Sequence, residues 1–135
     1  YRNDAIELRL LEVATGIVRE LLRDGHVNVE PQWSPDGTRV AFVSTSHEGL
    51  FHVFVAPFRN GALGDAERIT EDRDSKLPRY YYSVWDHYLS PTWSHDGREL
   101  IIVSNRERIW GTGGFWRMEA RAGAPMRSRI GPARV

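Results

Sequence analysis

Runs of apolar residues without polar alternation mark the chain as a β protein with covered sheets. They lie at residues 39–44, 50–58 and 99–104. In the first run, Val40 to Val43 are all apolar. A short run of this kind, bounded by turn residues, is typical of a strand buried on both faces. We therefore predict sheets that are stacked on one another.

A five-residue motif occurs twice. Trp33-Ser34-Pro35-Asp36-Gly37 returns almost unchanged as Trp93-Ser94-His95-Asp96-Gly97. Aspartate can bond its own backbone and glycine accepts a positive φ, so each copy predicts a tight turn between two strands. We assign the two tryptophans to packing between neighbouring sheets, because a ring of that size can bridge both.

Each copy of the motif stands at the same place in a series of strands. An entering strand leads to the turn, two buried strands follow, and a more polar outer strand ends the unit at 66–70 or at 126–130. This order is that of a four-stranded antiparallel blade, and blades stacked radially form a β-propeller. We predict an all-β fold, a partial β-propeller with about two to two and a half blades.

Residues 5–22 allow two interpretations. Ile6, Leu8 and Leu10 alternate with polar residues as in a strand, yet apolar residues also recur at helical spacing. Gly16 lies midway, where a hairpin turn favours glycine and a helix interior would lose about 1 kcal/mol to it. We predict two strands joined at 14–16, the end of a preceding blade, with a helix as the alternative.

Residues 71–88 do not fit the repeat. Large rings crowd into the end of this segment: Tyr80, Tyr81, Tyr82, Trp85 and Tyr88. Such a density of rings is unusual for a solvated loop. We predict an aromatic insertion with folded contacts of its own, between a blade at 27–70 and a blade at 89–130. All of them belong to a single propeller fragment over 1–135.

Composition narrows the classes of function. The chain is 41% hydrophobic and 27% charged, which is typical of a globular domain. Its 18 basic and 18 acidic residues balance, so no overall field attracts nucleic acid or an anionic membrane, and we predict neither as a partner. The chain has no cysteine, which excludes disulfides and thiol chemistry.

The motif and its flanking strands resemble the WD-like propeller repeat of the TolB family. The resemblance covers 30–70 and 89–130, and 5–22 is similar to the last two strands of a preceding blade. His95 replaces the usual proline, which should change the rigidity of the turn but not its path. The resemblance implies a propeller and a periplasmic or secreted location, and it says little about function.

Residues 79–119 carry a narrower resemblance, through Tyr-Tyr-Tyr-Ser, Asp-His, Val-Ser-Asn-Arg and Gly-Thr-Gly-Gly-Phe-Trp-Arg-Met. These segments are similar to the TolB-like propeller that precedes a metal-dependent amidohydrolase-type domain in some large bacterial proteins. None of that catalytic domain is in this sequence, so the resemblance assigns no catalytic residue.

A closed propeller needs more blades than this sequence predicts. Propellers usually have about four to eight blades. We therefore expect the sequence to be an excerpt of a longer protein. An open stack exposes apolar blade faces, so we expect the isolated chain to self-associate.

Three segments hint at ion binding, and each departs from its motif. His47 and His52 are five residues apart, whereas the zinc-protease helix needs a spacing of four. Residues 72–75 lack the glycine and closing glutamate of a calcium loop. Residues 111–114 enter a strand, whereas a phosphate cradle opens a helix, so they predict a close backbone approach instead. We predict no metal and no cofactor.

The insertion holds the best candidates for function. Asp86 and His87 could orient a ring or bind a metal, although adjacent residues of a strand point to opposite faces. With Arg106 they would make the chain an enzyme. A second alternative is a sugar or small-ligand site on the rings of Tyr80, Tyr81, Tyr82 and Trp85.

Our leading interpretation is a non-catalytic propeller segment. It would bind a protein partner, or cover the active site of an adjacent catalytic domain, as in a hydrolase of the amidohydrolase type. A structural role accounts for each part of the repeated motif, namely Trp33, Ser34, Asp36, Gly37, Trp93, Ser94, Asp96 and Gly97. We therefore assign no catalytic residue and expect function in the insertion.

Overall fold

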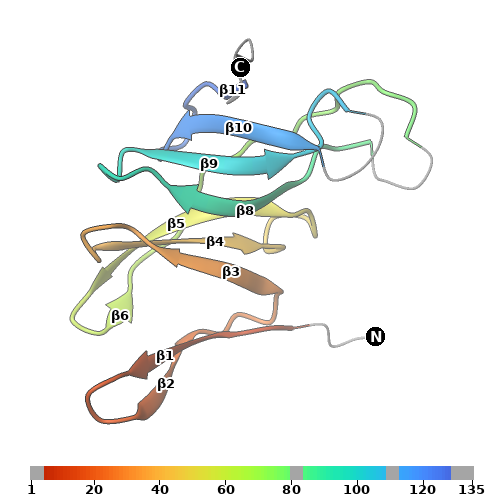
Figure 1. The fold of residues 1–135 in the computed structure, drawn as a ribbon. Helices are drawn as coiled ribbons and strands as arrows, with labels where there is room; N and C mark the ends of the chain where they lie inside the picture. Colours follow the sequence, from red (N-terminus) through yellow and green to blue (C-terminus); the bar gives the residue numbers. More distant parts are fainter. Residues whose placement is uncertain (1–4, 80–83, 109–112, 129–135) are drawn as a thin grey trace.

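The structure is a computed structural model that describes residues 5–79, 84–108 and 113–128 (Figure 1). The strands are β1 (Leu8–Glu12), β2 (Ile17–Leu22), β3 (Asn28–Trp33), β4 (Arg39–Ser44), β5 (His52–Arg59), β6 (Ala62–Leu63), β7 (Glu67–Arg68), β8 (Tyr88–Trp93), β9 (Glu99–Ser104), β10 (Gly114–Glu119) and β11 (Arg127–Ser128). Within the described ranges there is no helix, and so none that is long and apolar enough to cross a membrane. The predicted all-β fold class is confirmed.

The strands form three antiparallel units that follow one another along the chain (Figure 1). The N-terminal hairpin pairs β1 with β2. The middle blade has the order β3-β4-β5, and β5 pairs along its other edge with both β6 and β7. The C-terminal blade has the order β8-β9-β10-β11. These units are a partial β-propeller, as predicted.

The N-terminal hairpin settles the ambiguity of residues 5–22. Gly16 has a φ of 76° and its amide donates to the carbonyl oxygen of Glu12, so the chain reverses at this glycine. The helix alternative is wrong, because a positive φ at mid-segment ends any helix. Ile6 also forms a parallel bridge with Val27 beside the start of β3.

The two blades share a structural feature that the sequence repeat does not show. The first strand of each blade has a bulge at the same position, where Glu30 and Ser90 take φ values of 56° and 51°. Positive φ is uncommon at residues other than glycine. Because both copies have it, the bulge belongs to the repeat and bends each entering strand before its turn.

The two faces of the middle blade contribute to two different hydrophobic clusters. Ala41 and Val43 of β4 face the C-terminal blade and pack in a cluster with Leu100 and Ile102. The alternate residues belong to the second cluster, which lies toward the N-terminal hairpin: Leu8, Val40, Phe42, Phe54 and Ala56. This division explains the run of apolar residues without alternation, since both faces of β4 are buried.

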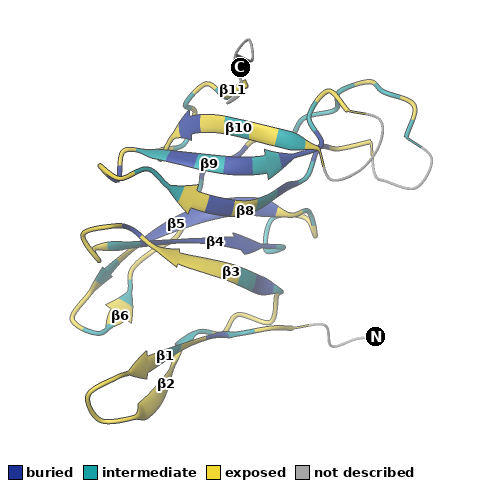
Figure 2. Ribbon diagram, in the orientation of Figure 1, coloured by how far each residue is buried: buried dark blue, intermediate teal, exposed yellow. Residues whose placement is uncertain are grey.

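The outer units are less covered than the middle blade (Figure 2). In β2 the first four residues are exposed. On the far face of the C-terminal blade, the side chain of Phe115 is 51% exposed and Ile101 is half-buried. Apolar surface therefore remains open on a face of the described structure, which is the feature behind the predicted self-association.

The loops divide into two groups at opposite ends of the strands (Figure 1). The turn end carries the two copies of the repeated motif, after β3 and after β8. The loop end carries the β4–β5 loop, the connector between the blades at 69–87, and the described parts of the β9–β10 loop. At this end Gly113 has a φ of 106°, and a Cβ there would lie 1.7 Å from the carbonyl oxygen of Ser104. A side chain at Gly113 is therefore excluded.

Candidate functional site

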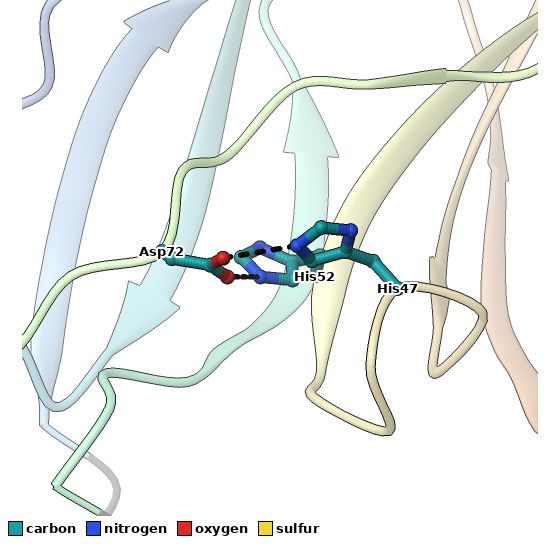
Figure 3. Close-up of side chains that lie close together, drawn as sticks. All are labelled: His47, His52 and Asp72. Atoms are coloured by element: carbon teal, nitrogen blue, oxygen red, sulfur yellow. Dashed lines mark hydrogen bonds and ion pairs between the residues drawn. The ribbon is translucent and has the colours of Figure 1, made fainter.

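Two histidines and an aspartate meet at the loop end (Figure 3). His47 lies in the β4–β5 loop, His52 begins β5, and Asp72 lies in the connector between the blades. Nε2 of His47 is 2.9 Å from Oδ2 of Asp72, and Nε2 of His52 is 2.8 Å from Oδ1. A single carboxylate therefore holds both rings, one on each oxygen.

His52 is the fixed member of this cluster. Its side chain is fully buried and stacks on the ring of Tyr88, with centroids 5.5 Å apart. Nδ1 lies 2.7 Å from the hydroxyl oxygen of Thr70, which also accepts a hydrogen bond from the amide of Val53. Burial lowers the pKa of His52 below its ordinary value, and Asp72 opposes that shift. Burial therefore favours the neutral form of the ring.

Asp72 is placed by the strand that precedes it. The amide of Ile69 donates to Val53, which extends the pairing of β7 with β5, and Thr70 follows as a buried residue. The chain then leaves the sheet and brings the carboxylate of Asp72 over the start of β5. Hydrogen bonding with His47 is the largest cause that lowers the pKa of Asp72. The carboxylate is thus ionised and faces both rings.

The predicted residues Asp86 and His87 lie at the end of the connector. Asp86 is buried, and its carboxylate accepts hydrogen bonds from the hydroxyl of Ser75 and from Nη2 of Arg79, at 2.9 Å each. Arg79 also donates to the carbonyl oxygen of Asn105 and is itself buried. His87 donates its backbone amide to the side chain of Asn105. Asp86 therefore ties parts of the connector together, and Arg79 and His87 hold it against the β9–β10 loop.

The remaining candidate residues lie in different surroundings. Arg106 sits over the ring of Trp116, with its guanidinium carbon 5.3 Å from the centroid, and it lines a depression with Tyr88 and Asp72. Burial is the largest cause that raises the pKa of Tyr88 to about 12. Trp85 is 41% exposed at the loop end. Tyr80, Tyr81 and Tyr82 lie outside the described residues, so a sugar site on their rings stays a prediction.

The repeated motif forms the same turn in both blades. In each, the serine hydroxyl donates to the aspartate, at 2.8 Å for Ser34 and 2.7 Å for Ser94. The glycines that end the motif have φ values of 74° and 73°. The path of the turn is therefore the same with Pro35 or with His95 at the third position of the motif.

The tryptophan in the second copy of the motif, Trp93, contacts the preceding blade. Nε1 of Trp93 donates to the carbonyl oxygen of Gln32 at 2.9 Å, and the guanidinium of Arg39 lies 4.6 Å from the ring centroid. Arg39 also donates to the carbonyl oxygen of Gly97. Trp33 instead packs edge-on against Phe58 of its own blade and is 48% exposed.

Sequence reasoning missed the cluster of His47, His52 and Asp72 because it tested each segment against a motif of its own. The spacing of the histidines was compared with a helix, and Asp72 with a calcium loop. In the structure Asp74 of that segment accepts from the amide of Lys76 as a local turn residue. A polar residue at the start of an otherwise apolar strand, as His52 is, is the signal that could have pointed to the site.

Comparison with known proteins places the fold. No family model matches the chain. The Tol-Pal system protein TolB from Anaeromyxobacter sp. (strain K) and that from Anaeromyxobacter dehalogenans (strain 2CP-1) are 32% identical to it over 125 residues. The matches cover 89% of this chain and 28% of each relative, so the chain spans between a quarter and a third of their length.

Two solved structures share the arrangement of strands. A putative TolB from Agrobacterium tumefaciens matches 93% of this chain and 42% of its own, with a TM-score of 0.65 and 18% identity. A puromycin-hydrolysing peptidase from Mycobacterium tuberculosis matches 86% of this chain and 16% of its own, with a TM-score of 0.61 and 19% identity. Together with the strand order, these matches define the chain as part of a β-propeller. The repeat and the similarity to TolB identify it as a TolB-like β-propeller segment, as the motif predicted.

Proposed function

We propose that this chain is a non-catalytic module that binds a protein partner or an adjacent domain through its loop end. One observation carries the proposal: large apolar side chains are exposed there, in the β4–β5 loop and in the connector. They are Phe51 at 41%, Val84 at 55% and Trp85 at 41% exposure. Aromatic residues of this kind dominate the binding energy of protein interfaces.

Between the two whole blades the turn end is lined by charged residues, and this favours the loop end as the binding surface, although Trp33 beside the first turn is 48% exposed. Its residues between the blades are charged: Arg39, Asp96, Arg98, Glu99, Glu119 and Arg121. Several of these charges are engaged with one another or with the backbone, as in the pair of Arg121 with Glu119 at 2.8 Å. Rim charges that are already paired and solvated contribute little to affinity.

The relatives agree with a role in protein assembly. The TolB proteins are named as members of a Tol-Pal system, and a member of a protein system works through contacts with other members. The non-catalytic part of the proposal is supported by Asp86, whose carboxylate is buried and hydrogen-bonded to Ser75 and Arg79 as part of the folded connector.

A second candidate is a propeller that covers the active site of a hydrolase domain. It is favoured by the match to 16% of the peptidase from Mycobacterium tuberculosis, since segments of this shape occur inside an enzyme. In that case the loop end would face a catalytic domain of the same protein. Both candidates use the same surface, and they differ in whether the partner is joined to the chain.

Site-specific photocrosslinking tests the proposal. A benzophenone amino acid replaces Phe51 at the loop end, and a matched variant replaces His95 at the turn end. We expect a discrete crosslinked species of defined mass from position 51 and none from position 95. Phe51→Ser with Trp85→Ser should then weaken the identified complex by about 10-fold or more. Equal crosslinking from both ends would contradict the proposal, as would hydrolase activity lost in His87→Ala.

A further inference from the structure

We propose that His47, His52 and Asp72 bind one divalent transition-metal ion, and that zinc suits these donors best. Two imidazole nitrogens and a carboxylate are a ligand set that protein zinc sites use, and imidazole favours zinc, copper, iron and nickel over calcium or magnesium. A metal site is a function separate from partner binding. It concerns residues that the sequence analysis rejected as metal ligands. That exclusion rested on helical spacing, which does not apply to a loop, a strand and a connector.

The donor atoms already converge. The three ligand atoms lie within 4.8 Å of one another, and the two nitrogen–oxygen distances are 2.9 Å and 2.8 Å. Tetrahedral zinc–ligand bonds of about 2.0–2.2 Å place neighbouring ligand atoms about 3.3–3.6 Å apart. The two nitrogen–oxygen distances are shorter than this by about half an ångström, so the ligands would separate slightly around the ion. His47 and Asp72 lie in loops and can adjust by tenths of an ångström around the buried ring of His52.

Residues around the ligands supply the support that metal sites need. A ligating histidine usually bonds its second ring nitrogen to an acceptor that fixes the ring. Thr70 is in that position, 2.7 Å from Nδ1 of His52, and it is buried. If its hydroxyl accepts from Nδ1–H, the lone pair of Nε2 points at the site. Tyr88 fixes the plane of the ring from one side.

A bound ion would also leave coordination positions open. The side chains of His47 and Asp72 are 29% and 37% exposed, so the side of the site opposite His52 faces solvent. Three protein ligands with an open position is the pattern of zinc sites that bind water or another ligand. The chain has no cysteine, so thiolate ligands cannot compete.

The alternative is a hydrogen-bonded cluster without an ion. In that arrangement the Thr70 hydroxyl donates to Nδ1 of His52, and Nε2–H donates to Asp72. The two arrangements differ in the tautomer of His52. Nitrogen-15 NMR of the ring distinguishes them, because the protonated nitrogen is Nδ1 in the metal-bound state and Nε2 in the hydrogen-bonded state.

Equilibrium dialysis of the tag-free chain against zinc tests the site. We expect about one zinc per chain, with affinity reduced by at least 10- to 100-fold in Asp72→Asn and in His47→Gln. His26→Gln and His95→Gln, which alter histidines outside the cluster, should leave affinity unchanged. The wild type should show Nδ1 of His52 protonated when zinc is added.

Two outcomes would overturn the proposal. One is the absence of saturable zinc binding at concentrations up to the order of 1 mM, a Kd that corresponds to about 4 kcal/mol. The other is zinc binding that both cluster variants retain. Circular dichroism of the variants excludes misfolding as the cause of a loss, and the NMR result on the unaltered chain decides independently of any substitution.

Discussion

The middle blade has a neighbour on each side, and the two junctions differ. At its junction with the C-terminal blade, the ring of Trp93 bonds to Gln32 and lies under Arg39, while Glu30 accepts from the amide of Ser90 at 2.8 Å. At its junction with the N-terminal hairpin, Trp33 is 48% exposed. The same motif thus makes different contacts, depending on whether a whole blade or a hairpin faces it.

This difference shows which contacts the motif forms by itself and which need a neighbouring blade. Its serine, aspartate and glycine close the turn without help from a neighbour, since both turns share the hydrogen bonds of the serine hydroxyl to the aspartate and from a backbone amide to the serine. Its tryptophan needs a partner surface, because the indole Nε1–H bonds to a carbonyl of another strand. The turn is therefore a local property of the sequence, whereas the packing of the ring is a property of the stack.

The largest expected effect comes from the ion pair that anchors the connector. Arg79 and Asp86 lie 2.9 Å apart with side chains 1% and 0% exposed. Arg79→Leu removes the buried guanidinium from Asp86 and leaves the more distant Arg73, whose Nε lies 3.7 Å from Oδ2, as the paired cation. The loss should cost about 3 kcal/mol of unfolding free energy, the lower end for a broken buried ion pair. Urea denaturation measures this cost.

The matched control lies in the N-terminal hairpin. Arg9 and Glu7 are 2.7 Å apart, but the side chain of Arg9 is 64% exposed. Arg9→Leu should cost less than about 1 kcal/mol, because exposed ion pairs contribute little. Similar losses from Arg79→Leu and Arg9→Leu would contradict the distinction between the buried and the exposed ion pair.

The tryptophans should differ by a smaller amount. Trp93→Ala removes a partly buried ring, its hydrogen bond and its contact with Arg39, and should cost about 2–4 kcal/mol. Trp33→Ala should cost about 1 kcal/mol, since nearly half of this side chain is exposed. Thermal and urea unfolding of the two variants measure the difference, and a larger loss at Trp33 would reverse the comparison.

The smallest effect concerns the aspartates of the two turns. Hydrogen bonds from the amide and hydroxyl of Thr38 lower the pKa of Asp36 from 3.8 to about 2, and Ser34 adds to this. Because the folded-state pKa lies below the unfolded one, this stabilisation is present above pH 3.8 and is lost as the pH falls toward 2.

NMR titration of the aspartate carboxyl groups tests this explanation of the Asp36 pKa. Asp96 has Arg98 in place of Thr38 and lacks a hydroxyl donor at that position. We therefore expect Asp36 to titrate at lower pH than Asp96, and Thr38→Val to raise the pKa of Asp36. An unchanged titration of Asp36 in this variant would show that the Thr38 hydroxyl contributes nothing.

Local patterns predicted much of this fold. The strands predicted at 39–44 and 99–104 have those bounds in the structure, because long apolar runs between turn residues leave little choice. The short β6 was missed, and β7 is shorter than the predicted 66–70, since strands of two residues carry almost no periodicity. The Gly113 approach to Ser104 agrees with the close backbone contact expected at 111–114.

The candidate site was beyond such patterns. Asp72 meets His52 across 20 residues, and Arg79 meets Asn105 across 26. These contacts form because β7 returns the chain to the loop end and the connector then crosses to the next blade. Neither contact follows from a sequence periodicity or a sequence motif. Each can be recognised only when the blades are assembled in the structure. The expectation that function lies at 71–88 remains a prediction, and the cluster with Asp72 gives it a specific form.

Native-state hydrogen exchange tests the difference between the two junctions most directly. We predict that the amides of β4, β5 and β9 exchange with one shared free energy, because the two blades unfold together. The amides of β1 and β2 should exchange at a lower free energy, since the hairpin opens by itself. Protection of β1 and β2 equal to that of β4, or exchange of β9 well below that of β4, would contradict this account.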